Sequence, residues 1–192
     1  MKFSEVVELW KVEVFDTPSR KLTISRVVKR LRGKQLEHYL FWFRLGQYLH
    51  RKPRGFFNYR AMARRIHARL LRMHGIDIMM GAEIGANFHI GHRVGVVITD
   101  KARIGKNFLI RQNTTIGLQD THKPGLIHIG DNVEMGANCC VISNDLRIGD
   151  GAVIGAMSFV NKDVPAGATF YTTHTPNIRL APAVTAAESP AA

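Results

Sequence analysis

Histidines are the side chains most able to do chemistry in this chain. His89, His92 and Arg93 fall within the stretch NFHIGHRVGVVITD at residues 87–100. An imidazole changes its protonation near neutral pH, so a histidine here could act as a general base or bind a metal. His89 and His92 are three residues apart, and an extended strand turns such positions to opposite sides, so a shared metal ion is not expected. We expect His89 on a solvated or intersubunit surface. We expect Arg93 on a solvated face, with contact to an acidic acceptor as its alternative.

The elements that position these residues follow a period of six. From residue 76 onward aliphatic residues recur, mostly at steps of six. The recurring positions are Ile78, Ile84, Ile90, Ile98, Ile104, Ile110, Ile116, Ile129, Met135, Ile142, Ile148, Ile154 and Val160. Neither an α-helix nor an alternating strand has this period, whereas three six-residue segments make one coil of a parallel β-helix. We therefore predict a mainly β domain over 76–165 with these side chains stacked inside.

Three irregular steps interrupt the repeat. They run from Ile90 to Ile98, from Ile116 to Ile129 and from Met135 to Ile142. Inserted residues cannot enter a stacked core, so they loop outward, where functional residues often lie. The first interruption directly follows His92, and the second includes LQDTHKPGLIH at 118–128, with His122 and His128.

Residues 1–75 are expected to form a small, basic α-helical region. Apolar residues recur at helical spacing in 35–51 and 56–75, and KPRG at 52–55 separates the two segments. Residues 1–80 contain 18 Lys and Arg against 6 Asp and Glu, whereas residues 81–192 contain 9 of each. Contact of residues 20–72 with an anionic membrane and a solvated basic face are both open explanations. No nucleic-acid recognition motif accompanies the charge, so nucleic acid is not an expected partner.

The remaining sequence features concern location and the chain end. Cys139 and Cys140 are adjacent, so no disulfide framework is implied and a reducing compartment fits. No secretory-signal pattern or membrane-length apolar run is present. We expect a cytoplasmic protein, at the inner face of the cell membrane if the basic helices bind lipid. Residues 166–192 are expected to be a C-terminal extension with a disordered tail.

Specific motifs within the repeat point to a family. They are GIDIMMGAEIGANFHIGHRVGVVI at 75–98, IRQNTTIG at 110–117 and HIGDNVEMGANCCVI at 128–142. Residues 75–165 resemble the hexapeptide-repeat acyltransferases, whose coils form a left-handed parallel β-helix. Within that superfamily the chain is similar to serine O-acetyltransferases and to acetyltransferases of bacterial exopolysaccharide clusters. The resemblance implies a homotrimer with acetyl-CoA in a groove between neighbouring β-helices, and no metal.

The resemblance also implies site residues. His92 matches the general base of the serine enzymes, and Asp77 matches the aspartate that orients it. A second family histidine has no clean equivalent: His122 is nearest in chemistry and His128 in ungapped position. Glycines after the aliphatic positions leave backbone N–H groups for the oxyanion or pantetheine. The implied acetyl-CoA positions, with the last two near its phosphates, are Gly117, Gly136, Ala137, Ala156, Lys162 and Arg179.

The acceptor is the point on which the sequence departs from the serine enzymes. There an aspartate that helps to hold the amino acid precedes the base, and here Gly91 takes its place. The acidic D-P-A element of their helical domain is also missing, and exopolysaccharide acetyltransferases tolerate both departures. We therefore expect direct transfer of acetyl to a sugar hydroxyl in capsule or exopolysaccharide synthesis. The alternative is serine O-acetylation.

Two further classes stay open at this point. One is a metal enzyme of the γ-carbonic-anhydrase type, which would use His92, His122 and His128 across a trimer interface. The other is a non-catalytic trimeric scaffold.

Overall fold

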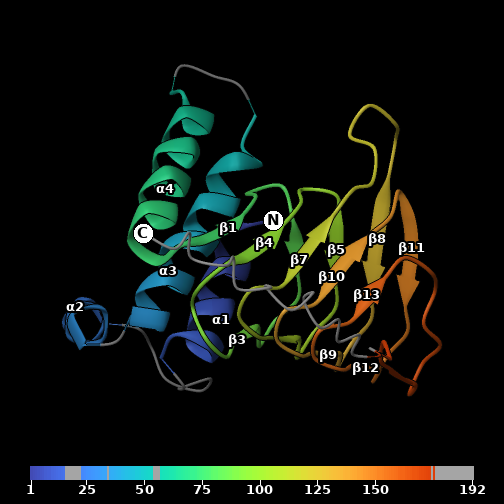
Figure 1. Cartoon of the computed structure of the whole chain (residues 1–192). Helices are drawn as coiled ribbons and strands as arrows, with labels where there is room; N and C mark the ends of the chain where they lie inside the picture. The colour runs from blue at the N-terminus through green and yellow to red at the C-terminus, as the bar shows by residue number, and fades with distance from the viewer. Residues whose placement is uncertain (16–22, 34, 54–56, 174, 176–192) are drawn as a thin grey trace, which may run out of the picture.

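The computed structural model describes residues 1–15, 23–33, 35–53, 57–173 and 175, in which helices precede a parallel β-helix. The helices are α1 (Phe3–Glu13), α2 (Ile24–Gly33), α3 (Gln35–His50) and α4 (Tyr59–His74). Figure 1 shows them gathered at the end of the β-helix where β1 lies. No helix in these ranges is both long and apolar enough to cross a membrane. Arg179 and the tail that was expected to be disordered lie outside the described residues.

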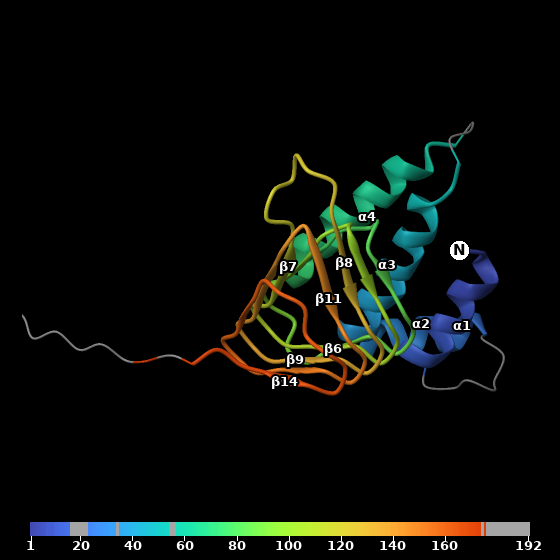
Figure 2. The same cartoon turned by 90° about the vertical axis from the view of Figure 1, so that its right-hand side faces the viewer.

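Three parallel sheets form the β-helix, and Figure 2 shows its three-sided outline. We call them sheets A, B and C. Sheet A contains β1 (Ile76–Ile78), β4 (Val96–Ile98), β7 (Thr115–Gly117), β10 (Cys140–Ile142) and β13 (Phe159–Val160). Sheet B contains β2 (Glu83–Ile84), β5 (Ala102–Ile104), β8 (Leu126–Ile129) and β11 (Asp145–Ile148). Sheet C contains β3 (His89–Ile90), β6 (Leu109–Ile110), β9 (Glu134–Met135), β12 (Val153–Ile154) and β14 (Thr169–Phe170).

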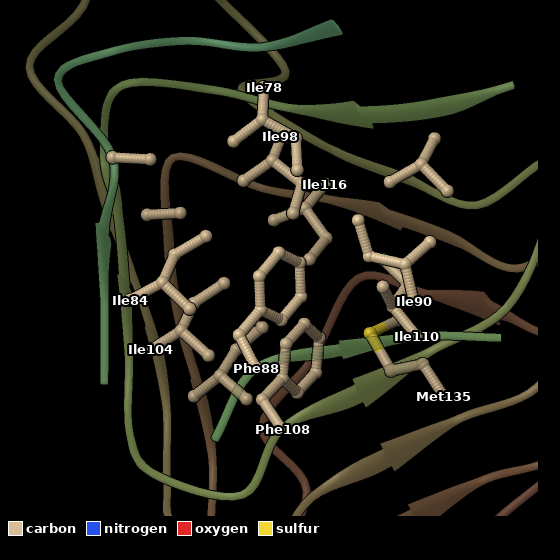
Figure 3. Packing of buried hydrophobic residues seen from close by; sticks show 14 of the residues in the cluster. Ile78, Ile84, Phe88, Ile90, Ile98, Ile104, Phe108, Ile110, Ile116 and Met135 are labelled. Carbon is tan, nitrogen blue, oxygen red and sulfur yellow. The ribbon is translucent and has the colours of Figure 1, made fainter. Parts of the chain in front are cut away.

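The stacked aliphatic core confirms the predicted β-helix. Ile78, Ile98 and Ile116 occupy one column of successive coils (Figure 3), and each is fully buried. The Phe88 and Phe108 rings stack with centroids 5.9 Å apart. Each such side chain contributes about 1.5–3 kcal/mol through burial. The repeat therefore supplies the energy that holds the outer loops in place.

The pairing register corrects one predicted core position. Val141 pairs with Ile116 and with Val160, and it is fully buried, whereas Ile142 is only half-buried. The step from Met135 to the inward residue is therefore the regular six, and the prediction of Ile142 was wrong. Valine and isoleucine are equally suited to the inward position, so composition alone could not choose between neighbours. The extra residue of the third interruption lies after β10, at 143–144.

Parallel pairing extends beyond the expected domain boundary at residue 165. β14 pairs with β12, and Val164 forms an isolated bridge to Ile148. The ladder therefore reaches Phe170. The apolar signal weakens there because the last strand is short and only partly buried.

A buried ion pair joins the helical region to the first coils. The Arg44 guanidinium donates to Glu13, with Nη2 2.6 Å from Oε1 and Nε 2.9 Å from Oε2. It also donates to the carbonyl oxygens of Ile84 and Gly85, each at 2.8 Å. Glu13 in turn accepts the backbone N–H of Phe88 at 3.2 Å. These contacts fix α1 and α3 against the β-helix, and they thereby position α4 beside β1.

Candidate active site

His92 lies in the exposed turn that connects β3 to β4, at the edge between sheets C and A. The turn is held at both ends of its backbone: the Gly91 N–H donates to the Ile110 carbonyl at 2.9 Å, and the Gly95 N–H donates to the Gly75 carbonyl at 3.0 Å. Gly95 has φ of 67°, a conformation that side chains disfavour. The His92 ring makes no hydrogen bond within the described part of the chain. It is therefore an accessible imidazole on a fixed turn.

Asp77 has a partner that the sequence did not indicate. Its Oδ1 lies 2.9 Å from Nε2 of His67, which α4 presents toward β1. His67 follows the buried Ala63 by four residues and precedes the buried Leu70 by three, so it shares the packed face of α4. Both side chains of the pair are partly exposed. Within one chain Asp77 therefore contacts His67, and its contact with His92 stays a prediction.

A cluster of aromatic rings adjoins this pair where α3 meets α4. The His74 ring lies 5.7 Å from the His38 ring and 5.4 Å from the Tyr39 ring. Burial, followed by the charge of His38 and of Arg93, lowers the pKa of His74. Burial, followed by the charge of Asp77, raises the pKa of the Tyr39 hydroxyl. Asp77, and Arg93 of the His92 turn, thus act electrostatically on this cluster of α3 and α4 residues.

The cluster predicts a pH dependence of folding stability. Burial, followed by the charge of Arg69, lowers the pKa of His38, and burial lowers that of His74. Each free ring has an ordinary pKa of 6.5, so the unfolded chain binds protons first as the pH falls. The melting temperature should therefore decrease as the pH falls below 6.5. In scanning calorimetry between pH 7.5 and 5.5, a His38→Gln/His74→Gln double variant should show a smaller decrease than the wild type. An equal decrease would count against the cluster as its source.

A surface groove follows sheet C and contains three of the predicted acetyl-CoA positions. Its volume is about 320 Å³. The lining residues are Leu109, Arg111, Glu134, Met135, Gly136, Ala137, Val153, Ile154, Gly155 and Ala156. A Cβ on Gly136 would lie 2.6 Å from the Ala156 nitrogen, so close stacking of coils requires glycine there. The structure thus brings Gly136, Ala137 and Ala156 together in one groove.

The groove is in line with His92. Four residues each lie two positions beyond the paired inward residues of sheet C, and they are His92, Gln112, Ala137 and Ala156. Adjacent coils are about 4.8 Å apart, so these positions form a row that begins at the His92 turn. The Gln112 Oε1 is buried without a partner among the described residues. Sequence reasoning missed Gln112, although its spacing of two from Ile110 was available as a signal.

Backbone N–H groups without a hydrogen bond to a described residue occur in this row, but they belong to the alanines and not to the glycines that were expected. The Gly136 N–H donates to the Ile154 carbonyl at 2.8 Å, so the prediction that glycine N–H groups are accessible was wrong there. The reason is that the residue after each inward aliphatic still belongs to the interstrand ladder. One residue further on, the N–H groups of Ala137 and Ala156 make no hydrogen bond with the described residues. These two alanines are therefore available donors beside the groove.

The other predicted site residues lie elsewhere in the chain. His122 is exposed in the projecting loop between β7 and β8 (Figure 1), at the opposite edge of sheet A from His92. Asn144 holds this loop, since its side chain accepts the Asp120 N–H and donates to the Asp120 carbonyl, both at 2.8 Å. His128 lies on sheet B, paired with Arg103 and Arg147.

Two acetyl-CoA positions and the possible metal ligands are also separated within one chain. Gly117 ends β7 in sheet A, and Lys162 is exposed after β13. Across the described ranges, no three His, Cys, Asp or Glu side chains of one chain are grouped for a metal ion. His92 could meet His122 or Lys162 of a second copy only through assembly of the chain.

Comparison with known proteins extends over both the helices and the β-helix. No protein-family model matches the chain. Serine acetyltransferase of Helicobacter pylori is 37% identical over 134 residues, which cover 69% of this chain and 74% of that protein. Serine acetyltransferase of Staphylococcus epidermidis is 40% identical over 115 residues, 58% of this chain and 53% of that protein. The match to serine acetyltransferase 4 of Arabidopsis thaliana covers only 30% of its length.

Solved structures agree with this result. The soybean serine acetyltransferase complexed with serine superimposes with a TM-score of 0.69 at 29% identity, over 89% of this chain and 70% of that one. A serine acetyltransferase in complex with CoA, at 22% identity and a TM-score of 0.70, shares the fold. The match to the H. pylori relative, together with the agreement in fold, shows that this left-handed β-helix acyltransferase belongs to the serine acetyltransferase family.

Proposed function

We propose that the chain transfers the acetyl group of acetyl-CoA to the hydroxyl of serine, with His92 as the general base. The relatives named serine acetyltransferase support serine rather than the sugar acceptor that Gly91 led us to expect. The observation that carries the proposal is the row of His92, Gln112, Ala137 and Ala156, whose last two members line the groove.

This row suits an extended thioester substrate. The pantetheine arm of acetyl-CoA carries two amides, and the free N–H groups of Ala137 and Ala156 can donate to their carbonyl oxygens. The unpaired Oε1 of Gln112 can accept an amide N–H. Held in this way, the arm would end with its thioester beside the His92 turn. Fixing both reactants in this orientation supplies a large part of the rate enhancement of such a transfer.

The chemistry then needs one base. His92 takes the hydroxyl proton as the serine oxygen attacks the thioester carbonyl, and a tetrahedral oxyanion forms. Collapse of this intermediate breaks the carbon–sulfur bond, and the His92 imidazolium returns the proton to the leaving thiolate. Asp77, held by His67, is the proposed orienting carboxylate. No covalent enzyme intermediate is needed because the thioester is already activated.

A trimer completes this proposal. In a single chain the groove along sheet C and the row that begins at His92 are open to solvent. The loop with His122 projects from the edge of sheet A opposite the His92 turn. In a threefold assembly the loop of one copy could close the groove of its neighbour, which is where His122 and Lys162 would act. The proposed partners are therefore acetyl-CoA, serine and two further copies.

The acceptor is tested by incubating purified protein with acetyl-CoA and one acceptor at a time, while free thiol is followed. We expect thiol release with serine and only background release with polysaccharide fragments. Turnover with the fragments and none with serine would reverse the assignment.

Restoring the aspartate that precedes the base should improve serine use. A Cβ on Gly91 would meet Arg111 Cγ at 3.5 Å, an ordinary contact, so Gly91→Asp should fit. A carboxylate that binds the serine ammonium should raise kcat/KM for serine by about tenfold, mainly through KM. Gly91→Asn is the matched control, because it has the same size without the charge. No gain from Gly91→Asp over Gly91→Asn would show that serine is held by other residues.

A further inference from the structure

One side of α4 carries cationic and large apolar side chains together. Met62, Arg65, Arg69 and Met73 follow each other at steps of three or four residues, so they lie along one stripe of the helix. Met62 is 47% exposed and Met73 is 52% exposed. Exposed apolar side chains mark an interaction surface where they form a contiguous patch.

A groove continues this stripe toward α3. Its volume is about 270 Å³, and it is lined by His38, Trp42, Arg65, Ile66, Arg69 and Leu70. Trp42 is 36% exposed at this groove, whereas Trp10 is 7% exposed and stacks on Phe41 at 4.2 Å. A tryptophan beside two arginines combines an apolar ring with a polar N–H, which suits a boundary between water and hydrocarbon. We name the stripe and this groove together the α3–α4 face.

The charge of α4 decides which partner is suitable. The helix contains no Asp or Glu, and its five arginines are exposed without an ion pair to any described residue. A second copy of this face would bring like charges together, which opposes self-association. An anionic surface would instead neutralise the arginines while the methionines and Trp42 leave water. Arg-rich helices with exposed apolar side chains bind anionic lipid by both effects.

We propose that the α3–α4 face docks the protein on a bilayer that contains anionic phospholipid. Arg65 and Arg69 contact headgroup phosphates at the groove, and Met62, Met73 and Trp42 enter the interface. Figure 1 shows α4 at the end of the molecule opposite the last coils, so a flat surface can approach it. Docking leaves the His92 turn unchanged and needs no acetyl-CoA. It is therefore independent of the proposed acetyl transfer.

Vesicle binding of the full chain tests this proposal. Phosphatidylcholine vesicles with phosphatidylglycerol should sediment the protein and shift its tryptophan emission to the blue, and phosphatidylcholine alone should do neither. The shift should disappear in Trp42→Phe, because Trp10 is already buried. Binding should weaken as salt is raised. Inorganic phosphate without vesicles should cause no shift. A phosphate-induced shift that prevents vesicle binding would assign the groove to a free anion and overturn the proposal.

Matched charge variants make the test specific to one side of α4. Arg65→Gln/Arg69→Gln should reduce the partition coefficient about 30-fold. Arg60→Gln/Arg64→Gln removes the same charge from another side of the helix and should reduce it by at most about threefold. Equal losses, or no binding that depends on phosphatidylglycerol, would refute the α3–α4 face. The proposal would also be refuted if the wild type did not bind vesicles and Arg65→Gln/Arg69→Gln changed the oligomeric state, as measured by light scattering. His92→Ala should bind vesicles as the wild type does, whatever its effect on acetyl transfer.

Discussion

Replacing His92 by alanine should lower kcat for acetyl transfer by about 10²–10⁴-fold, the usual contribution of a positioned general base. The ring is exposed on a turn that backbone hydrogen bonds hold, and it has no hydrogen bond of its own to a described residue. Its removal should therefore leave the fold intact and affect the chemical step. KM for acetyl-CoA should change little, because the proposed contacts of the arm are with the backbone N–H groups of Ala137 and Ala156, which the substitution leaves in place. Free-thiol release under saturating acetyl-CoA measures kcat, and melting temperature reports the fold.

His89→Ala provides the control for this experiment. His89 is exposed on β3, three residues before His92. The substitution therefore removes an identical side chain from the same region. Its kcat should stay within about twofold of the wild type, as for most surface substitutions away from a site. Equal losses in the two variants would point to a general surface effect rather than to a base. Wild-type activity of His92→Ala in cells would favour the scaffold hypothesis instead.

The fold could be predicted because the repeat is redundant. Many inward aliphatic residues indicate the same period, so an error at Ile142 did not affect the architecture. That error has a local cause, since pairing with Ile116 and Val160 selects Val141, and pairing is not visible in one sequence. The exposed turn at His92 was predictable for a related reason: extra residues within a stacked coil must leave it. Positions defined by counting were thus within reach of sequence reasoning.

Contacts between distant segments were not predictable. His67 approaches Asp77 because of how α4 packs on β1, and the spacing between these residues carries no sign of it. The acetyl-CoA positions show a finer limit. Counting placed Gly136 and Ala137 side by side, but the hydrogen-bond ladder uses the N–H of Gly136 and leaves that of Ala137 free. A shift of one residue along a coil changes a backbone donor from structural to available.

Arg44→Met should lower the free energy of unfolding by about 3–5 kcal/mol, because it removes one partner of a buried ion pair. The Arg44 side chain is 1% exposed and that of Glu13 is fully buried. Methionine fills similar volume, so the loss comes from the uncompensated Glu13 carboxylate and from the carbonyl oxygens of Ile84 and Gly85. Urea unfolding, followed by far-ultraviolet circular dichroism, measures this loss in the free energy of unfolding.

Two companions separate charge from geometry at this junction. Arg44→Lys keeps the charge but not the planar fork that reaches a carboxylate and two carbonyl oxygens at once, so an intermediate loss is expected. Glu13→Leu/Arg44→Met removes both charges, and it should be more stable than Arg44→Met alone because no charge is left buried. If the double variant is the less stable of the two, Glu13 contributes mainly through the Phe88 N–H rather than through Arg44. The ion pair fixes α1 and α3 on the first coils, and α4 packs on α3 and holds His67 against Asp77. Arg44→Met should therefore weaken acetyl transfer even at urea concentrations at which the chain is still folded.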